Sequence, residues 1–165
     1  MAEARKNAFL QIRVSPSQKA ALRRQARRVG MDVSRFVLDR VLPEWGTQLQ
    51  SLLDRLTKKP MDAALLAAIG DALREISTPG FIGATAALGV HHLGDLDRTL
   101  IAAMVEHAAA LKGVSAPPWT MKIGPLKEPY FASALPSLRL HLLTASPPPY
   151  RRRNLFLDAS LDDRV

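Results

Sequence analysis

The apolar positions of this chain predict one short strand followed by several helices. Over residues 8–14 the apolar Leu10, Ile12 and Val14 alternate with other side chains, and a period of two is typical of a strand with two unlike faces. A lone strand of this length is unstable in water. We therefore expect it to pair with another strand, for which a second copy of the chain is one source.

Helical spacing follows the strand. Apolar residues recur every three or four positions, as in helices packed along one face, over residues 22–29, 36–41, 45–56, 61–76 and 96–111. Ser15 or Ser17 is suited to cap the first helix, and Gly30 to end it. Pro43 is expected to interrupt the chain after the second helix, because proline removes a backbone hydrogen bond.

The rest of the chain is less regular. Residues 77–80 (Ser-Thr-Pro-Gly) predict a turn, and the glycines within residues 81–94 weaken any helix there. Eight of the twelve prolines lie after residue 115, where we expect ordered extended connections, a short helix over 135–143 and a short strand at 154–157. The expected fold class is mainly α: an N-terminal strand and two helices, then a helical region with a proline-rich, irregular end.

The net charge is informative because of where it lies. The chain carries a formal net charge of +8. Residues 1–30 hold eight basic residues and one acidic residue, a net charge of +7, whereas the remaining 135 residues hold 15 basic and 14 acidic residues, a net charge of +1. Positive charge concentrated in this way is typical of a nucleic-acid contact rather than of general solubility.

Composition excludes several classes of protein. A chain of 165 residues that is 47% hydrophobic and 23% charged is expected to form one or two globular domains. The absence of cysteine excludes disulfides, thiolate metal sites and cysteine nucleophiles. No apolar run approaches the roughly 20 residues that span a bilayer, and the N-terminus lacks a signal-peptide core. We therefore expect no membrane association and a cytoplasmic location.

The order strand, helix, glycine, helix resembles the ribbon-helix-helix family of bacterial repressors and antitoxins (the Arc and MetJ type). The resemblance is carried by Phe9-Leu10-Gln11-Ile12-Arg13-Val14-Ser15-Pro16-Ser17, Leu22, Ala26, Val29-Gly30-Met31, Ser34 and Phe36-Val37. It implies an intertwined homodimer whose two strands form an antiparallel ribbon in the DNA major groove. It also implies that Leu10, Ile12 and Val14 enter the dimer core, and that residues 1–43 form the DNA-binding and dimerisation domain.

Residue chemistry in this segment suits DNA contact. By the resemblance Phe9, Gln11 and Arg13 face the groove. Arginine can bind guanine, and glutamine adenine, through two hydrogen bonds each. The start of the second helix, which Asp32 or Ser34 can cap, offers backbone N–H groups to a phosphate. The residues expected to contact phosphates are Arg5, Lys6, Val33, Ser34 and Arg35.

Two alternatives remain open for the basic residues of the first helix, which are Lys19, Arg23, Arg24, Arg27 and Arg28. They can add phosphate contacts, which position a protein on DNA without reading its sequence. They can instead form a solvated face or meet an acidic protein partner. Phe9 likewise can face the groove or turn inward.

The C-terminal part carries a second resemblance, to the C-terminal region of certain bacterial helix-turn-helix antitoxins. It rests on Trp119, Leu126-Lys127-Glu128-Pro129-Tyr130-Phe131, Leu138-Arg139 and residues 146–158. Those antitoxins are usually encoded beside a toxin with a nucleotidyltransferase fold, although a ribbon-helix-helix head departs from their pattern. The resemblance implies that residues 44–165 form a helical domain that binds and neutralises a cognate toxin.

Aromatic and arginine side chains, which are enriched at interface cores, gather in this region. The residues expected to bind the partner are Trp119, Tyr130, Phe131, Tyr150, Arg151, Arg152 and Arg153. Alternatively, the aromatic residues close a small core that includes Phe156. The arginines then face solvent, contact nucleic acid, or pair with Asp158, Asp162 or Asp163.

Catalysis is not expected from these residues. His91, His92, Asp95 and Asp97 are metal-ligand types, but adjacent histidines diverge on a helix, and no His-x-x-x-His or Glu-x-x-His spacing is present. A phosphate-binding glycine loop and a nucleophile elbow are also missing. We expect no metal, no cofactor and no enzymatic activity.

The expected function is that of an antitoxin that binds operator DNA as a dimer, represses its own operon and neutralises a toxin through its C-terminal domain. The dimers can also pair into a higher assembly. The alternative is a stand-alone ribbon-helix-helix transcriptional regulator whose C-terminal domain oligomerises or senses a ligand. A toxin gene directly beside this one favours the antitoxin, and an isolated gene favours the regulator.

Overall fold

The computed structural model divides into two compact units, Met1–Val41 and Leu42–Val165. It describes residues 11–28, 30, 32–34, 36–37, 44–133 and 135–158. Within these residues the protein is mainly helical, as the apolar pattern predicts, and has one small two-stranded sheet. The sequence pattern places the domain boundary after residue 43, close to the division between the two units.

In the first unit, α1 (Pro16–Arg28) begins with a capping box. Ser15 Oγ accepts a hydrogen bond from the Gln18 backbone N–H at 3.2 Å, and Gln18 Oε1 accepts one from the Ser15 N–H at 2.8 Å. Each bond satisfies an N–H group that the start of a helix leaves unpaired. Of the two serines suited to the cap, Ser15 fills that role. Gly30 ends the helix with a φ of +67°, a conformation that glycine adopts readily because it has no Cβ.

Parts of the predicted strand and second helix lie within the described residues. Residues 11–14 form neither helix nor strand within this chain, so the strand is not confirmed there, and residues 8–10 lie outside the described residues. Residues 33–34 and 36–37 are helical, and the Phe36 N–H donates to the Asp32 carbonyl at 2.9 Å. The helical segment therefore starts directly after Asp32.

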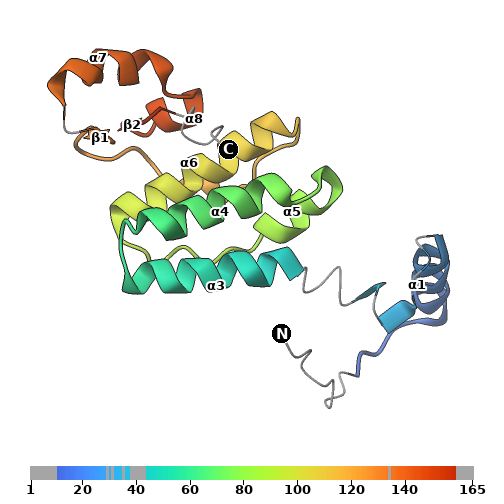
Figure 1. Ribbon diagram of the computed structural model, residues 1–165. Helices are drawn as coiled ribbons and strands as arrows, with labels where there is room; N and C mark the ends of the chain where they lie inside the picture. The colour runs from blue at the N-terminus through green and yellow to red at the C-terminus, as the bar shows by residue number, and fades with distance from the viewer. Residues whose placement is uncertain are drawn as a thin grey trace. The chain divides into compact units, whose positions relative to one another are not determined.

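In the second unit, α3 (Glu44–Lys58), α4 (Ala63–Glu75) and α6 (Asp95–Leu111) lie side by side, and α4 contacts both of the others (Figure 1). α5 (Thr78–Thr85) packs against α3. The apolar stripes predicted over 45–56 and 61–76 form much of the core, where the buried residues include Leu49, Leu52, Leu53, Leu56, Leu65, Ile69, Leu73 and Ile76. These two helix predictions are confirmed.

The turn predicted at residues 77–80 is wrong, because these residues begin a helix. Thr78 is the first residue of α5, and Pro79 lies in its first turn. Proline is tolerated there, since the N–H that it lacks would have no partner within the helix. The turn-forming residues therefore mark the boundary between two helices. The undecided segment 81–94 is helical as far as Thr85 and irregular beyond it.

The central helix of the second unit, α6, is buried on most of its surface. It ends in a Schellman motif, in which the Gly113 N–H donates to the Ala110 carbonyl at 3.1 Å and the Val114 N–H to the Ala109 carbonyl at 3.0 Å. Gly113 has a φ of +66°, so the predicted stop at this glycine is confirmed. Leu111, the last residue of the predicted apolar stripe, is exposed, because it occupies the final turn of the helix.

Beyond α6 the chain forms short elements joined by extended segments. η1 (Thr120–Lys122) and α8 (Pro148–Arg151) pack on α6. β1 (Tyr130–Phe131) pairs in parallel with β2 (Leu155–Phe156), and α7 (Pro136–Ala145) contacts β2. The short helix predicted at 135–143 and the short strand predicted at 154–157 are confirmed.

A buried carboxylate joins α6 to the turn that precedes α4. The Oδ1 atom of Asp97 accepts a hydrogen bond from the Met61 backbone N–H at 3.1 Å. Met61 has a φ of +56°, which is unfavourable for a residue with a side chain, so this bond holds a strained turn. Burial raises the pKa of Asp97 above its ordinary value, and the hydrogen bond from Met61 opposes that rise.

The raised pKa of Asp97 predicts a pH-dependent stability. The folded chain binds the Asp97 proton more tightly than the unfolded chain, so the free energy of unfolding should fall as the pH rises from about 4 through the raised pKa. Asp97→Asn keeps an oxygen that can accept from Met61 but carries no charge. Urea unfolding at about pH 4 and about pH 7 should show the wild type losing stability relative to Asp97→Asn. An equal change in the two proteins would contradict this.

Candidate functional site

The first unit presents a cationic surface. Helix α1 contains no acidic residue, and its basic residues are all exposed: Lys19, Arg23, Arg24, Arg27 and Arg28. Gln11 and Arg13, which are predicted to read bases, are exposed as well. Because no carboxylate on this helix competes for the cations, their charge is available to an anionic partner.

Apolar side chains lie beside these cations. Ile12 is 58% exposed and Val14 is 42% exposed. They share a cavity of about 660 Å³ with Arg13, Lys19, Leu22, Arg23 and Val33. Both side chains therefore leave apolar surface uncovered within this chain.

The other residues predicted to contact DNA are only partly described. Val33 is half-buried and Ser34 is exposed, both in the helical segment that follows Asp32. The remaining predicted contacts lie outside the described residues: Arg5, Lys6, Phe9 and Arg35.

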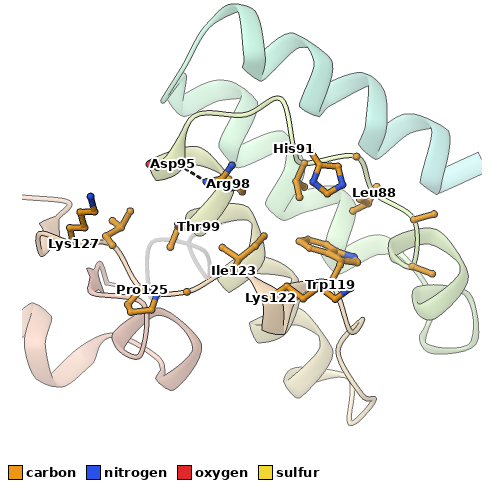
Figure 2. A pocket seen from close by; sticks show the side chains of 16 residues that line it. Leu88, His91, Asp95, Arg98, Thr99, Trp119, Lys122, Ile123, Pro125 and Lys127 are labelled. Carbon is orange, nitrogen blue, oxygen red and sulfur yellow. Dashed lines mark hydrogen bonds and ion pairs between the residues drawn. The ribbon is translucent and has the colours of Figure 1, made fainter.

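A groove opens on the second unit between the segment 86–91, the first turns of α6 and the segment 119–127 (Figure 2). Its volume is about 660 Å³, which is within the range of ligand-binding pockets. The side chains that give it its character are Leu88, His91, Asp95, Arg98, Trp119, Lys122, Ile123 and Lys127. We call this site the groove.

The groove combines an aromatic wall with positive charge. The Trp119 ring lies toward one end and Lys127 toward the other (Figure 2). Lys122 and Lys127 are exposed, whereas Arg98 is half-buried and forms an ion pair with Asp95. Three cations and one carboxylate line the groove, so its lysine, arginine and aspartate side chains carry a net charge of +2.

Two contacts fix the walls of the groove. The Trp119 Nε1–H donates to the Thr85 carbonyl at 2.8 Å, which orients the indole ring and uses its only polar hydrogen. Gln50 of α3 accepts from the Gly89 N–H at 2.8 Å and donates to the Gly89 carbonyl at 3.4 Å. The segment 86–91 is therefore attached to the helical core.

The fold packs the segments of the predicted partner-binding residues together, since β1 pairs with β2 and Arg153 donates to the Thr120 carbonyl, but not all of these residues reach the surface. Trp119 lines the groove and Arg151 is exposed, whereas Tyr150 is buried in the core beside α6. Tyr130 and Phe131 are half-buried on β1.

The aromatic residues of the small sheet support one another. The rings of Phe131 and Phe156 stack with their centroids 4.9 Å apart, and the Arg139 guanidinium lies 5.1 Å from the Phe131 centroid. Phe156 is half-buried rather than part of the buried core.

Arg152 and Arg153 converge on Glu106, a buried carboxylate in the middle of α6. Arg153 is itself buried, and its two terminal nitrogens donate to Glu106 Oε2 and Oε1, each at 2.7 Å. It also donates to the carbonyls of Thr120 at 2.7 Å and Pro149 at 3.1 Å. Arg152 donates to the same Glu106 carboxylate from a half-exposed position. Burial lowers the pKa of both arginines, and repulsion from Arg153 lowers that of Arg152 further.

These bonds give the arginine block an internal role. A paired hydrogen bond between arginine and carboxylate is among the strongest side-chain contacts. It attaches the segment after α8 to the central helix. Arg153 therefore stabilises the interior of the second unit. Its carboxylate partner is Glu106, not one of the aspartates that the sequence suggests.

The sequence does not predict Glu106 as a buried ion-pair partner, although a signal for that role exists. It continues a second stripe of α6 at spacings of three and four, formed by the small residues Thr99, Ala102, Ala103 and Ala109. A second stripe predicts a second buried face, and a buried carboxylate requires a hydrogen-bonded cation. In the C-terminal part of the sequence, the run of three arginines at 151–153 is the feature that best indicates a source for this cation.

Metal ligation finds no support among the described residues, where no three His, Cys, Asp or Glu side chains are grouped to hold an ion. His92 Nε2 lies 3.4 Å from Asp54 Oδ1, and His91 lines the groove.

Among the described residues, no helix is both long and apolar enough to cross a membrane.

No family model matches the chain, and neither a curated protein nor a solved structure matches it. Its function is therefore inferred from its residues and from where the fold places them.

Proposed function

We propose that this protein is a DNA-binding antitoxin. Residues 1–43 form a ribbon-helix-helix dimer that binds operator DNA in the major groove and represses the operon. Residues 44–165 bind and neutralise a cognate toxin. The observation that carries the proposal is the exposed cationic surface of α1 and Arg13, which lies beside the exposed Ile12 and Val14.

The charge of the first unit supports contact with DNA. Proteins that bind DNA owe much of their affinity to cations that displace condensed counterions from phosphates. Five exposed cations on α1 and Arg13 beside it supply such charge, and arginine and glutamine at positions 13 and 11 add the chemistry that reads base edges. A dimer presents each of these groups twice.

The apolar residues beside this surface support dimerisation. Ile12 and Val14, the two described members of the predicted inward face, are exposed within a single chain. In a ribbon formed by two chains, the partner's strand and helices cover this face. Because each side chain is only about half exposed, covering it contributes on the order of 1 kcal/mol, which favours pairing of the chains.

Neutralisation of a toxin is assigned to the second unit. Its residues 42–165 carry 13 basic and 12 acidic side chains, a net charge of +1, which is too small to attract DNA over a distance. The C-terminal resemblance to antitoxins and the groove both support a role in binding a protein.

Co-expression tests the division of labour between the two units. The product of a gene adjacent to this one should arrest growth when it is produced alone, and the full chain should restore growth. The Gln11→Ala/Arg13→Ala variant should still protect the cells but should no longer repress a reporter under the operon's promoter. Colony counts and reporter activity measure the two effects separately. If no adjacent gene product arrests growth, the stand-alone regulator replaces the antitoxin.

A further inference from the structure

The groove lies in the second unit, outside the unit proposed to bind DNA, and its chemistry defines a ligand. From its charges and its tryptophan wall we infer that the groove binds an extended acidic segment of a protein partner, with one apolar side chain of that segment against Trp119. This inference rests on the proposed function in one respect: the partner that supplies the segment is the toxin.

Charge complementarity predicts that the ligand of the groove is negatively charged. Lys122 and Lys127 are exposed, and neither forms an ion pair with a carboxylate among the described residues. Arg98 shares its charge with Asp95. Because the tryptophan and Lys127 lie toward opposite ends of the groove (Figure 2), an extended ligand can contact both.

The apolar wall of the groove predicts that the ligand also carries an apolar side chain. Trp119 uses its only N–H on the Thr85 carbonyl, so it offers ring surface rather than a hydrogen bond. Leu88 and Ile123 lie in the same groove. Aromatic rings and aliphatic chains bury their area most favourably against such a surface, which predicts a leucine, methionine or aromatic residue in the bound segment.

The balance of charges favours a peptide over a nucleic acid. A nucleic-acid strand needs a continuous run of cations, since its affinity arises from many phosphate contacts. The groove supplies three cations and places Asp95 among them, in a unit whose net charge is only +1. A short segment with two or three carboxylates matches these charges one for one.

Peptide selection on the full-length protein tests the inference without the toxin and without DNA. A phage-displayed library of random short peptides is selected on the wild type alone, and the selected peptides are then tested on Lys122→Glu/Lys127→Glu, in which two exposed lysines are reversed. The matched control is Lys58→Glu/Lys59→Glu, which reverses two exposed lysines, the last residue of α3 and the residue after it, outside the groove. Selected peptides are then titrated against protein labelled with 5-fluorotryptophan, whose two fluorine resonances report on Trp45 and Trp119.

The expected peptides contain at least two acidic residues and one apolar residue. They should shift the Trp119 resonance, leave that of Trp45 unchanged, and bind Lys122→Glu/Lys127→Glu about tenfold more weakly or worse, because reversal turns attraction into repulsion. They should bind Lys58→Glu/Lys59→Glu as well as the wild type.

Three results would overturn the inference. These are selection of no peptide, selection of peptides that ignore the charge reversal, and displacement of the peptides by oligo-dT bound more tightly at Trp119. None of these results bears on whether the first unit binds DNA or on whether the full chain protects cells in co-expression. Failure of the groove and failure of the proposed function are therefore distinguishable.

Discussion

Glu106→Ala is expected to destabilise the second unit by about 3–5 kcal/mol, the cost of leaving a buried charge without its counter-ion. Arg153 is as deeply buried as Glu106, and both of its terminal nitrogens donate to that carboxylate. Removing the carboxylate leaves the guanidinium with only the carbonyls of Thr120 and Pro149. Urea unfolding followed by far-UV circular dichroism measures the loss.

Two further variants separate charge from packing. Glu106→Leu combined with Arg153→Met replaces the buried ion pair by apolar side chains, which is often close to neutral, so the double variant should recover most of the stability that Glu106→Ala loses. Glu128→Ala removes an exposed glutamate and should cost less than about 1 kcal/mol. If Glu106→Ala costs no more than Glu128→Ala, the buried ion pair does not hold the C-terminal segment in place.

Gln11→Ala/Arg13→Ala is expected to weaken binding to the operon's promoter by about a hundredfold or more. Each two-bond contact between a side chain and a base contributes about 1–3 kcal/mol of discrimination, and a dimer presents both residues twice. Both side chains are exposed in the first unit, so their removal leaves its fold intact. Electrophoretic mobility shifts with the promoter duplex measure the change.

A matched variant in the second unit is the control for this loss. Gln48→Ala/Arg55→Ala removes one glutamine and one arginine from exposed positions of α3, and it should bind the promoter as tightly as the wild type. Equal affinity for all three proteins would show that positions 11 and 13 do not read bases, and the ribbon assignment would fall.

The helical part of the fold is largely readable from the sequence, because each main helix has a continuous apolar stripe. The stripe from Leu49 to Leu56 and that from Leu65 to Ile76 predict both the helices and their buried faces. Glycine and proline also carry boundary information. Gly113 ends α6 as expected, whereas Pro79 lies in the first turn of a helix that the turn motif concealed.

The candidate site is less predictable, because it depends on contacts between distant segments. Trp119 could be singled out by its residue type, but its place in the groove depends on a hydrogen bond to Thr85, 34 positions earlier. Arginine is a residue type enriched at interfaces. Arg153 is nevertheless buried, because it pairs with Glu106, 47 positions away. Spacing along the chain carries no information about such pairs, since each forms only when distant segments pack together: the end of α5 with the residue before η1, and α6 with the segment after α8.

The most direct test of the central claim is the ratio of two affinities of the full-length chain. One is for the promoter duplex of its own operon, and the other is for a duplex of the same length and composition in scrambled order, both at physiological salt. Sequence-specific recognition by a ribbon predicts binding to the promoter about a thousandfold tighter or better. Equal affinity for the two duplexes would contradict it and would leave the cations of α1 as a non-specific or protein-binding surface.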